Sequence, residues 1–165
     1  MSSATFKDVI NNVVGNVSIH KAKDVIIDAS ARSTTLVDEL FASGFNNVIG
    51  YGNNQKHEYI HSCDYMSLNL SRLDDVLKGK RVHFVCIPPF DAHIVRTLNY
   101  IKKYALFAHS FAFIVPASYK KDIYKTLFPA TFKKVFEKDY PSDAFVLNGK
   151  YNNAPHILQI WVKTN

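Results

Sequence analysis

The chain has 165 residues, and 47% of them are hydrophobic and 13% aromatic. A chain of this length can bury roughly 70% of the surface that it exposes when unfolded, so we expect a single domain over residues 1–165. The composition excludes disordered, collagen-like and low-complexity proteins. Twenty Lys and Arg residues against fourteen Asp and Glu residues give a net charge of +6, which suits a polyanionic partner but is also common among soluble proteins.

The chain shows no signal for export or membrane insertion. Its first twenty residues lack the apolar core of a signal peptide, and no run approaches the roughly 18 apolar residues that span a bilayer. We therefore expect a cytoplasmic or nuclear protein without a membrane partner. Cys63 and Cys86 lie in apolar surroundings without the spacing of a zinc site, so both are predicted to be buried reduced thiols.

Hydrophobic periodicity predicts strands that alternate with helices. Helical stripes occur at residues 4–14, 34–44, 70–80, 91–107 and 118–128. Short apolar, β-branched runs predict strands at residues 24–30, 47–52, 58–65, 81–87 and 110–116. Gly15, Gly44 and Gly79 are expected to end the first three helices, and Ser71 and Ser118 to cap the third and the last.

The C-terminal part of the chain is rich in predicted strands. These are residues 131–138, 144–151 and 156–163, with a turn signal at Asn148 and Gly149. We expect the last strands to form an antiparallel hairpin at one edge of the sheet. The alternation before them predicts an α/β fold with a mostly parallel sheet.

The segments that follow the predicted strands are the candidate site, because doubly wound sheets bind ligands at the carboxyl ends of their strands. The first four read "IIDASARSTTL", "GYGNN", "SCDYMSL" and "CIPPF". Together they resemble the class I methyltransferases that use S-adenosylmethionine, and in particular the DNA adenine-N6 methyltransferases with an NPPF motif. Residues 111–161 are similar to the C-terminal part of small enzymes of this type from phages and large DNA viruses.

The resemblance implies a doubly wound, mostly parallel seven-stranded Rossmann-like sheet with an antiparallel edge hairpin. It also implies roles for Ile87, Pro88, Pro89 and Phe90, which stand at the NPPF position. In the family a side-chain oxygen and a proline carbonyl accept the hydrogens of the adenine amine, and an aromatic ring stacks on the flipped base. Pro88 would supply the carbonyl and Phe90 the ring, but Ile87 has no oxygen. The alternative is that the prolines only end a strand and begin a helix.

The resemblance also places a degenerate cofactor site on the first loop. Asp28 stands at the family's acidic position, but Arg32 and Thr34 occupy the places of two glycines, which let the backbone approach the cofactor closely. Arg32 would bring a cation toward a sulfonium, unless its side chain turns outward or meets an anion.

Two further strand ends bear on cofactor binding. The second strand ends in Tyr51, Gly52 and Asn53, so no carboxylate is available to grip the two ribose hydroxyls. Asp64 matches the acidic residue that contacts the adenine amino group of the cofactor. It is equally interpretable as a solvated acid on a loop.

Other site chemistries find little support. His57 and His61 are four residues apart, but their segment leads into a strand rather than the helix that such ligand pairs use, so no metal is expected. Basic pairs interleaved with tyrosines predict a nucleic-acid face, or simply the wet side of an element. These residues are Lys102, Lys103, Lys120, Lys121, Lys133 and Lys134, with Tyr100, Tyr104, Tyr119 and Tyr124.

The combined interpretation is a degenerate methyltransferase-fold protein that binds no cofactor. It would act as a binding or assembly component: a protein partner of an active methyltransferase, a nucleic-acid binder, or a structural part of a virion or similar complex. The alternative is an active S-adenosylmethionine-dependent adenine-N6 methyltransferase.

Overall fold

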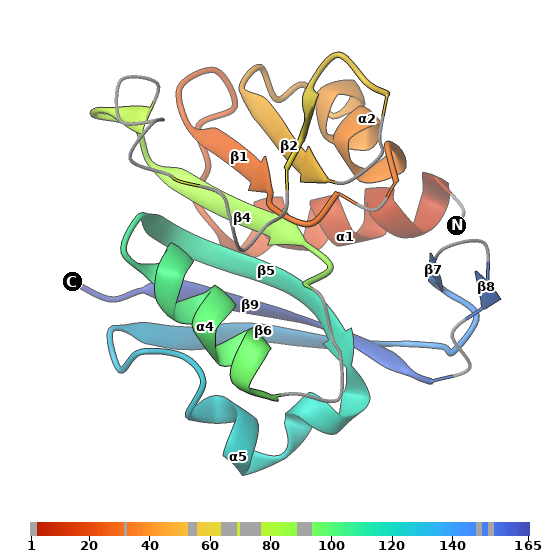
Figure 1. The fold of residues 1–165 in the computed structure, drawn as a ribbon, viewed down its shortest axis with the longest axis vertical. Helices are drawn as coiled ribbons and strands as arrows, with labels where there is room; N and C mark the ends of the chain where they lie inside the picture. The colour runs from red at the N-terminus through yellow and green to blue at the C-terminus, as the bar shows by residue number, and fades with distance from the viewer. Residues whose placement is uncertain are drawn as a thin grey trace.

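The computed structural model describes residues 3–31, 33–52, 56–63, 69, 77–88, 94–147, 150–151 and 154–165. Its centre is a seven-stranded sheet with the order β3-β2-β1-β4-β5-β9-β6 (Figure 1). The strands are β1 (Val25–Asp28), β2 (Val48–Gly52), β3 (Ile60–Ser62), β4 (Val82–Cys86), β5 (Ala108–Pro116), β6 (Phe132–Tyr140) and β9 (His156–Lys163). A separate two-stranded ladder joins β7 (Val146–Leu147) to β8 (Lys150–Tyr151).

The sheet is parallel from β3 through β5 and antiparallel beyond it. Each of the pairs β3 with β2, β2 with β1, β1 with β4 and β4 with β5 is parallel. Strand β9 pairs antiparallel with both β5 and β6, so β6 and β9 form the edge hairpin. The predicted α/β fold with a mostly parallel seven-stranded sheet and an antiparallel C-terminal edge is therefore confirmed.

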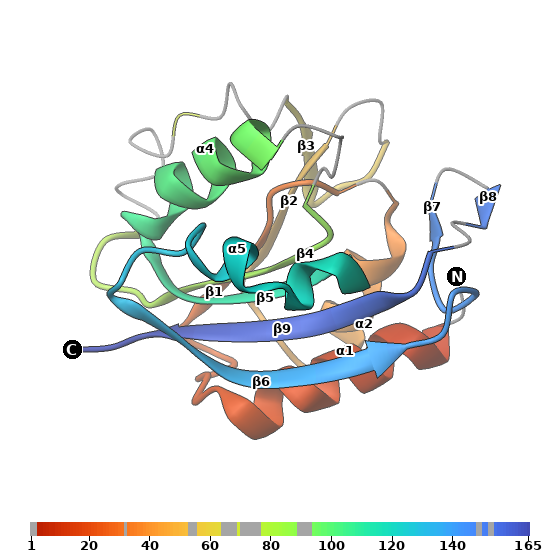
Figure 2. The same cartoon turned by 90° about the horizontal axis from the view of Figure 1, so that it is seen from below.

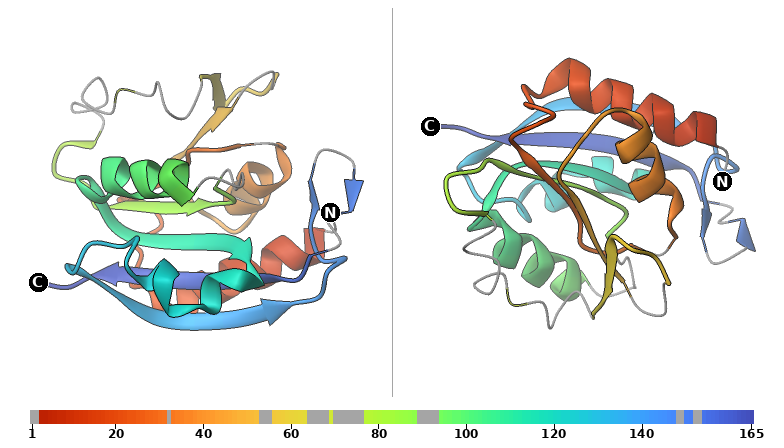
Figure 3. Two further views of the ribbon diagram at one scale, coloured as in Figure 1. Left: turned by 60° about the horizontal axis from the view of Figure 1, so that its bottom comes forward. Right: turned by 90° about the horizontal axis from the view of Figure 1, so that it is seen from above.

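Helices cover both faces of this sheet (Figures 2 and 3). On one face lie α1 (Ser3–Asn16) and α2 (Thr35–Ala42), whose apolar residues pack into one buried cluster. On the other lie α4 (Ile94–Ala105), the 3₁₀ helix η2 (Ala117–Lys120) and α5 (Asp122–Lys125). None of the helices in the described ranges is both long and apolar enough to cross a membrane.

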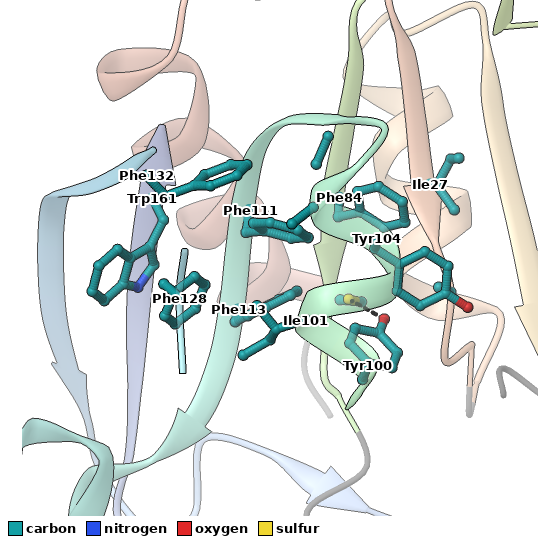
Figure 4. Packing of buried hydrophobic residues seen from close by; sticks show 14 of the residues in the cluster. Ile27, Phe84, Tyr100, Ile101, Tyr104, Phe111, Phe113, Phe128, Phe132 and Trp161 are labelled. Carbon is teal, nitrogen blue, oxygen red and sulfur yellow. Dashed lines mark hydrogen bonds between the residues drawn. The ribbon is translucent and has the colours of Figure 1, made fainter. Parts of the chain in front are cut away.

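The cluster beneath α4 and α5 is aromatic (Figure 4). The Phe128 ring stacks on the Trp161 indole at 3.9 Å between centroids, and the rings of Phe111 and Phe113 lie 4.9 Å apart. Aromatic pairs of this kind contribute about 0.5–1.5 kcal/mol beyond the area that they bury. This cluster fixes α4 over β4 and β5.

The structure removes three of the four tyrosines from the predicted tyrosine and lysine face. Tyr100 and Tyr104 are completely buried in the aromatic cluster, and Tyr119 is buried as well. On α4, the buried face that meets the sheet includes Thr97, Tyr100, Ile101 and Tyr104. A tyrosine ring is large enough to fill a core, and its hydroxyl finds a polar partner there, as the Tyr100 hydroxyl does 3.1 Å from the Cys86 sulfur.

Of the local predictions, some are confirmed and others are wrong. Gly15 lies inside α1 rather than at its end, whereas Gly44 and Gly79 do take the positive φ angles of helix-ending glycines. Ser118 lies within η2 and is not a cap. Cys86 is buried, but Cys63 is only half-buried. The predicted helix cap at Ser71 and the turn at Asn148 and Gly149 lie outside the described residues.

A buried polar network joins the amino ends of β1, β4 and β5. The His83 ring lies 3.2 Å from Asp24 Oδ2 through Nε2 and 2.7 Å from Ser110 Oγ through Nδ1. Arg81 pairs with the same carboxylate at 2.8 Å. Ser110 is only 1% exposed, so its hydroxyl cannot reach a substrate, and the network is structural. Burial lowers the pKa of His83 from 6.5 to about 4, so the ring is neutral at pH 7.

This pKa predicts a loss of stability in mild acid. Below pH 6.5 the unfolded chain takes up a proton at His83 that the folded chain refuses until about pH 4, so the free energy of unfolding falls across this window. At 1.36 kcal/mol per pKa unit the loss is about 3 kcal/mol. We expect His83→Gln to have a shallower decline between pH 6.5 and 4 in urea denaturation. The matched change His20→Gln, at an exposed ring, should leave the decline unchanged; equal slopes in all three proteins would contradict this assignment.

Candidate active site

The candidate site lies at the point in the sheet where the order of the strands reverses: β2 and β3 extend to one side of β1, and β4 and β5 to the other. Strands β1 and β4 are neighbours, and the connections that follow them lead to helices on opposite faces. In doubly wound folds this switch point is where ligands bind, at the carboxyl ends of the strands. We call residues 28–31, 51–52 and 86–88 the switch-point edge.

Asp28 ends β1 at this edge and is buried. The backbone N–H of Ser30 donates a hydrogen bond to Asp28 Oδ1 at 3.1 Å. This bond forms a turn at the start of the connection that follows β1, which we call the first loop. Cys86 lies nearby at the end of β4. Burial, reinforced by the charge of Asp28, raises the pKa of the Cys86 thiol well above its ordinary value of 9.0. The thiol therefore stays protonated, and Cys86 is no nucleophile.

A serine ties the first loop to the end of β4. The Ser30 hydroxyl donates to the backbone carbonyl of Ile87 at 2.6 Å, and both residues are buried. The Ile87 side chain is 8% exposed and belongs to the apolar cluster beneath α1 and α2. Position 87 therefore presents hydrocarbon rather than an acceptor, and it is packed rather than free to turn toward a ligand.

The same loop is also fixed to the end of β2. The backbone N–H of Ala31 donates to the Tyr51 carbonyl at 2.8 Å. A Cβ atom added to Gly52 would lie 2.0 Å from the Ala31 carbonyl oxygen, a distance that no real contact reaches. Position 52 is therefore glycine because another stretch of backbone passes directly over it.

The structure locates half of the predicted site residues. Asp28, Ile87 and Pro88 come together at the switch-point edge, where Pro88 is buried. Thr34 precedes α2 with φ −73° and ψ −20°, a conformation open to any residue, so the backbone here does not call for the family's glycine. The other four predicted positions, Arg32, Asp64, Pro89 and Phe90, lie outside the described residues.

Sequence reasoning missed the two residues that hold the loop. Gly52 had a usable signal, because a glycine inside a predicted strand often marks a close approach of another backbone. Ser30 had none, since its partner lies 57 positions away in the sequence. No group of three or more potential metal ligands occurs within the described ranges. His57 instead lies 2.9 Å from the Asp38 carboxylate.

Comparison with solved structures identifies the fold. No family model and no curated protein matches the sequence. A putative RNA methyltransferase from Pyrococcus horikoshii aligns with a TM-score of 0.59 and 13% identity, over 97% of this chain and 83% of that protein. A putative methyltransferase, yhhF, from Escherichia coli aligns with a TM-score of 0.53 and 10% identity, over 99% and 89% respectively. TrmN from Thermus thermophilus gives a TM-score of 0.57 and 10% identity, over 99% and 49%.

The chain has a class I methyltransferase-like fold. Identities of this size establish the architecture and leave the activity to be argued from the residues themselves. At the switch-point edge, a backbone hydrogen bond joins the first loop to β2, and the Ser30 hydroxyl joins it to the residue that follows β4.

The close contact at Gly52 predicts a severe substitution. We expect Gly52→Ala to lower the free energy of unfolding by more than about 3 kcal/mol, because its Cβ meets backbone atoms that cannot rotate away. The control is Gly15→Ala within α1, where a Cβ would have nothing within 4 Å. That change should raise stability by about 0.5–1 kcal/mol. Urea denaturation measures both, and a neutral Gly52→Ala would show that the loop is not held against β2.

The hydrogen bond from Ser30 predicts a smaller effect. Ser30→Ala leaves the buried Ile87 carbonyl without this donor, so we expect a loss of about 1–3 kcal/mol in the free energy of unfolding. Ser118→Ala, at an exposed position in η2, should change it by less than about 0.5 kcal/mol. Equal stabilities of the two variants would mean that the hydrogen bond does not hold the loop.

Proposed function

We propose that this chain is a catalytically degenerate methyltransferase-fold protein that works as a binding or assembly component. Its ancestry would be that of the adenine-N6 methyltransferases of NPPF type, because Pro88, Pro89 and Phe90 keep the last three residues of that motif. The proposal assigns it no S-adenosylmethionine and no group transfer.

The main support is the packing of the first loop onto β2. In the family that the sequence resembles, the cofactor lies against this loop and its ribose meets a carboxylate at the end of β2. Here β2 ends without a carboxylate, and the Ala31 backbone passes directly over Gly52. The cofactor would therefore lack its ribose acceptor and would have to displace a buried backbone contact before it could bind.

The environment of Ile87 gives independent support. An adenine amine is a weak nucleophile, and the family positions it with an oxygen at this place in the motif. Removing one such preorganised group commonly costs 10²- to 10³-fold in rate, so the substitution alone would weaken transfer without abolishing it. The buried Ile87 side chain and the loop contacts act on different parts of the reaction, and together they oppose activity.

The proposed binding or assembly role would depend on the surfaces that the protein presents to partners. Candidate partners are an active methyltransferase, a nucleic acid, or the other components of a virion or similar complex. Self-association through the free edge of the sheet is the least favoured of these routes. The edge strand β6 carries Lys133, Lys134 and Lys138, and charged side chains of this kind discourage edge-to-edge pairing.

Isothermal titration with S-adenosylmethionine tests the proposal. We expect no binding up to about 1 mM donor, whereas an active methyltransferase titrated in parallel should give a clear isotherm. The variant Ile87→Asn restores the first letter of the motif and leaves the contact between Ala31 and Tyr51 in place, so it should also fail to bind when thermal melts show it folded.

Methyl transfer from labelled donor to DNA provides the second readout. The proposal expects no labelled product from the wild-type chain. Micromolar binding of the donor, or product that Phe90→Ala abolishes, would contradict it and favour the active enzyme.

A further inference from the structure

The end of the sheet at which the parallel strands begin, opposite the switch point, is strongly basic. Strands β1, β4 and β5 begin there, β9 ends there, and β6 begins beside the end of β9. Helix α4 runs back to the same edge and ends in Lys102 and Lys103. We call the described residues 17–24, 43–47, 77–82, 102–109, 131–133 and 162–165 the amino-terminal edge.

The charges on this edge are almost all of one sign. Its only carboxylate side chain is Asp24. Its cationic side chains are Lys21, Lys23, Lys78, Lys80, Arg81, Lys102, Lys103, Lys133 and Lys163. The edge therefore carries more positive charge than the net +6 of the whole chain, and the rest of the chain is slightly acidic.

The single carboxylate cannot neutralise this surface. Asp24 is 5% exposed and binds inward, to Arg81, to the His83 ring and to the His20 backbone N–H at 2.8 Å. Lys23 and Lys80 are exposed and lie in no ion pair with a carboxylate of the described ranges. Their ammonium groups are therefore available to a partner.

The pKa of a histidine at this edge is lowered in part by the positive charges near it. His109 begins β5, and its Nδ1 accepts the backbone N–H of Val82 at 3.2 Å. Burial, together with the charges of Lys163 and Arg81, lowers the pKa of His109 below its ordinary value of 6.5. Protonation of the ring is thus disfavoured partly because these two cations lie near it.

We propose that the amino-terminal edge binds the phosphate backbone of a nucleic acid. This inference rests on the binding role proposed above and names its partner and surface. The cations come from β1, β4, β9 and β6 and from α4, so they form a row along the sheet. Four strand spacings of about 4.8 Å make that row roughly 19 Å long, enough to meet several phosphates of one strand.

The chemistry of the edge favours nucleic acid over a lipid surface. Membrane-binding faces combine basic residues with several apolar side chains that insert among the lipids. At this edge Leu106, which is 78% exposed, is the only large apolar side chain that stands well out among the described residues. Its phenylalanine and tyrosine rings are buried or half-buried, so among the described residues of this edge they offer no platform for stacking bases. The binding should therefore depend on charge and show little sequence preference.

The carboxyl end of α4 opposes the proposal only weakly. The carboxyl end of α4 carries a partial negative charge of about half an elementary charge, which falls off within one turn. Lys102 and Lys103 in that last turn outweigh it.

Fluorescence anisotropy with a labelled 20-base-pair DNA duplex of mixed sequence tests the proposal. We expect measurable binding at about 50 mM salt, with log K falling against log salt with a slope of about −4 or steeper. The double variant Lys23→Gln with Lys80→Gln should bind roughly tenfold more weakly, and its slope should be shallower by about 2. A duplex of a second sequence should bind equally well.

The matched control is Lys7→Gln with Lys121→Gln, which removes the same charge from exposed positions away from this edge. It should bind nearly as well as wild type, and thermal melts should show all three proteins folded. In the complex, bound phosphates should raise the pKa of His109, measured from its ring proton signals.

Three results would overturn the proposal: no binding at low salt, equal weakening by both double variants, or binding to phosphatidylserine vesicles without binding to DNA. None of these measurements contains S-adenosylmethionine or alters the switch-point edge. A negative result here would therefore leave the degenerate site as it stands, and donor binding would leave this test unaffected.

Discussion

The backbone of Ala31 lies so close to Gly52 that only a hydrogen atom fits between them at position 52. This contact, with the hydrogen bond from Ser30 to the Ile87 carbonyl, holds the first loop against both neighbours of β1. The loop is thereby packed as part of the folded core. Under the proposed function, the same packing that stabilises the chain opposes the binding of a methyl donor at this place.

The two ends of the sheet consequently differ in character. At the carboxyl ends of the strands, buried groups satisfy one another: Asp28 accepts from Ser30, and the Cys86 thiol meets the Tyr100 hydroxyl. At the amino ends, one buried carboxylate organises His83 and Arg81 while the lysines around it face water. A polyanion would find its complement at the second end, on the side of the molecule away from the switch-point edge.

The sequence sufficed for the architecture because parallel strands buried on both faces leave continuous β-branched runs, as at Val25–Asp28 and Val82–Cys86. It failed where burial depended on tertiary partners: Tyr100 and Tyr104 looked like surface residues beside lysines but fill the core under α4. At the candidate site, Asp28 and Ile87 were predicted from their places at the ends of strands, and the structure places both at the switch-point edge. Ser30 was not, since a hydrogen bond between residues distant in the chain leaves no local pattern.

The central claim is that the first loop occupies the place of the cofactor. A crystal structure of the protein soaked in S-adenosylmethionine tests this most directly. The account predicts that the Ala31 carbonyl still lies against Gly52 and that no donor density appears at the carboxyl ends of β1 and β2. Donor bound beside Asp28, with the first loop moved away from Gly52, would contradict it.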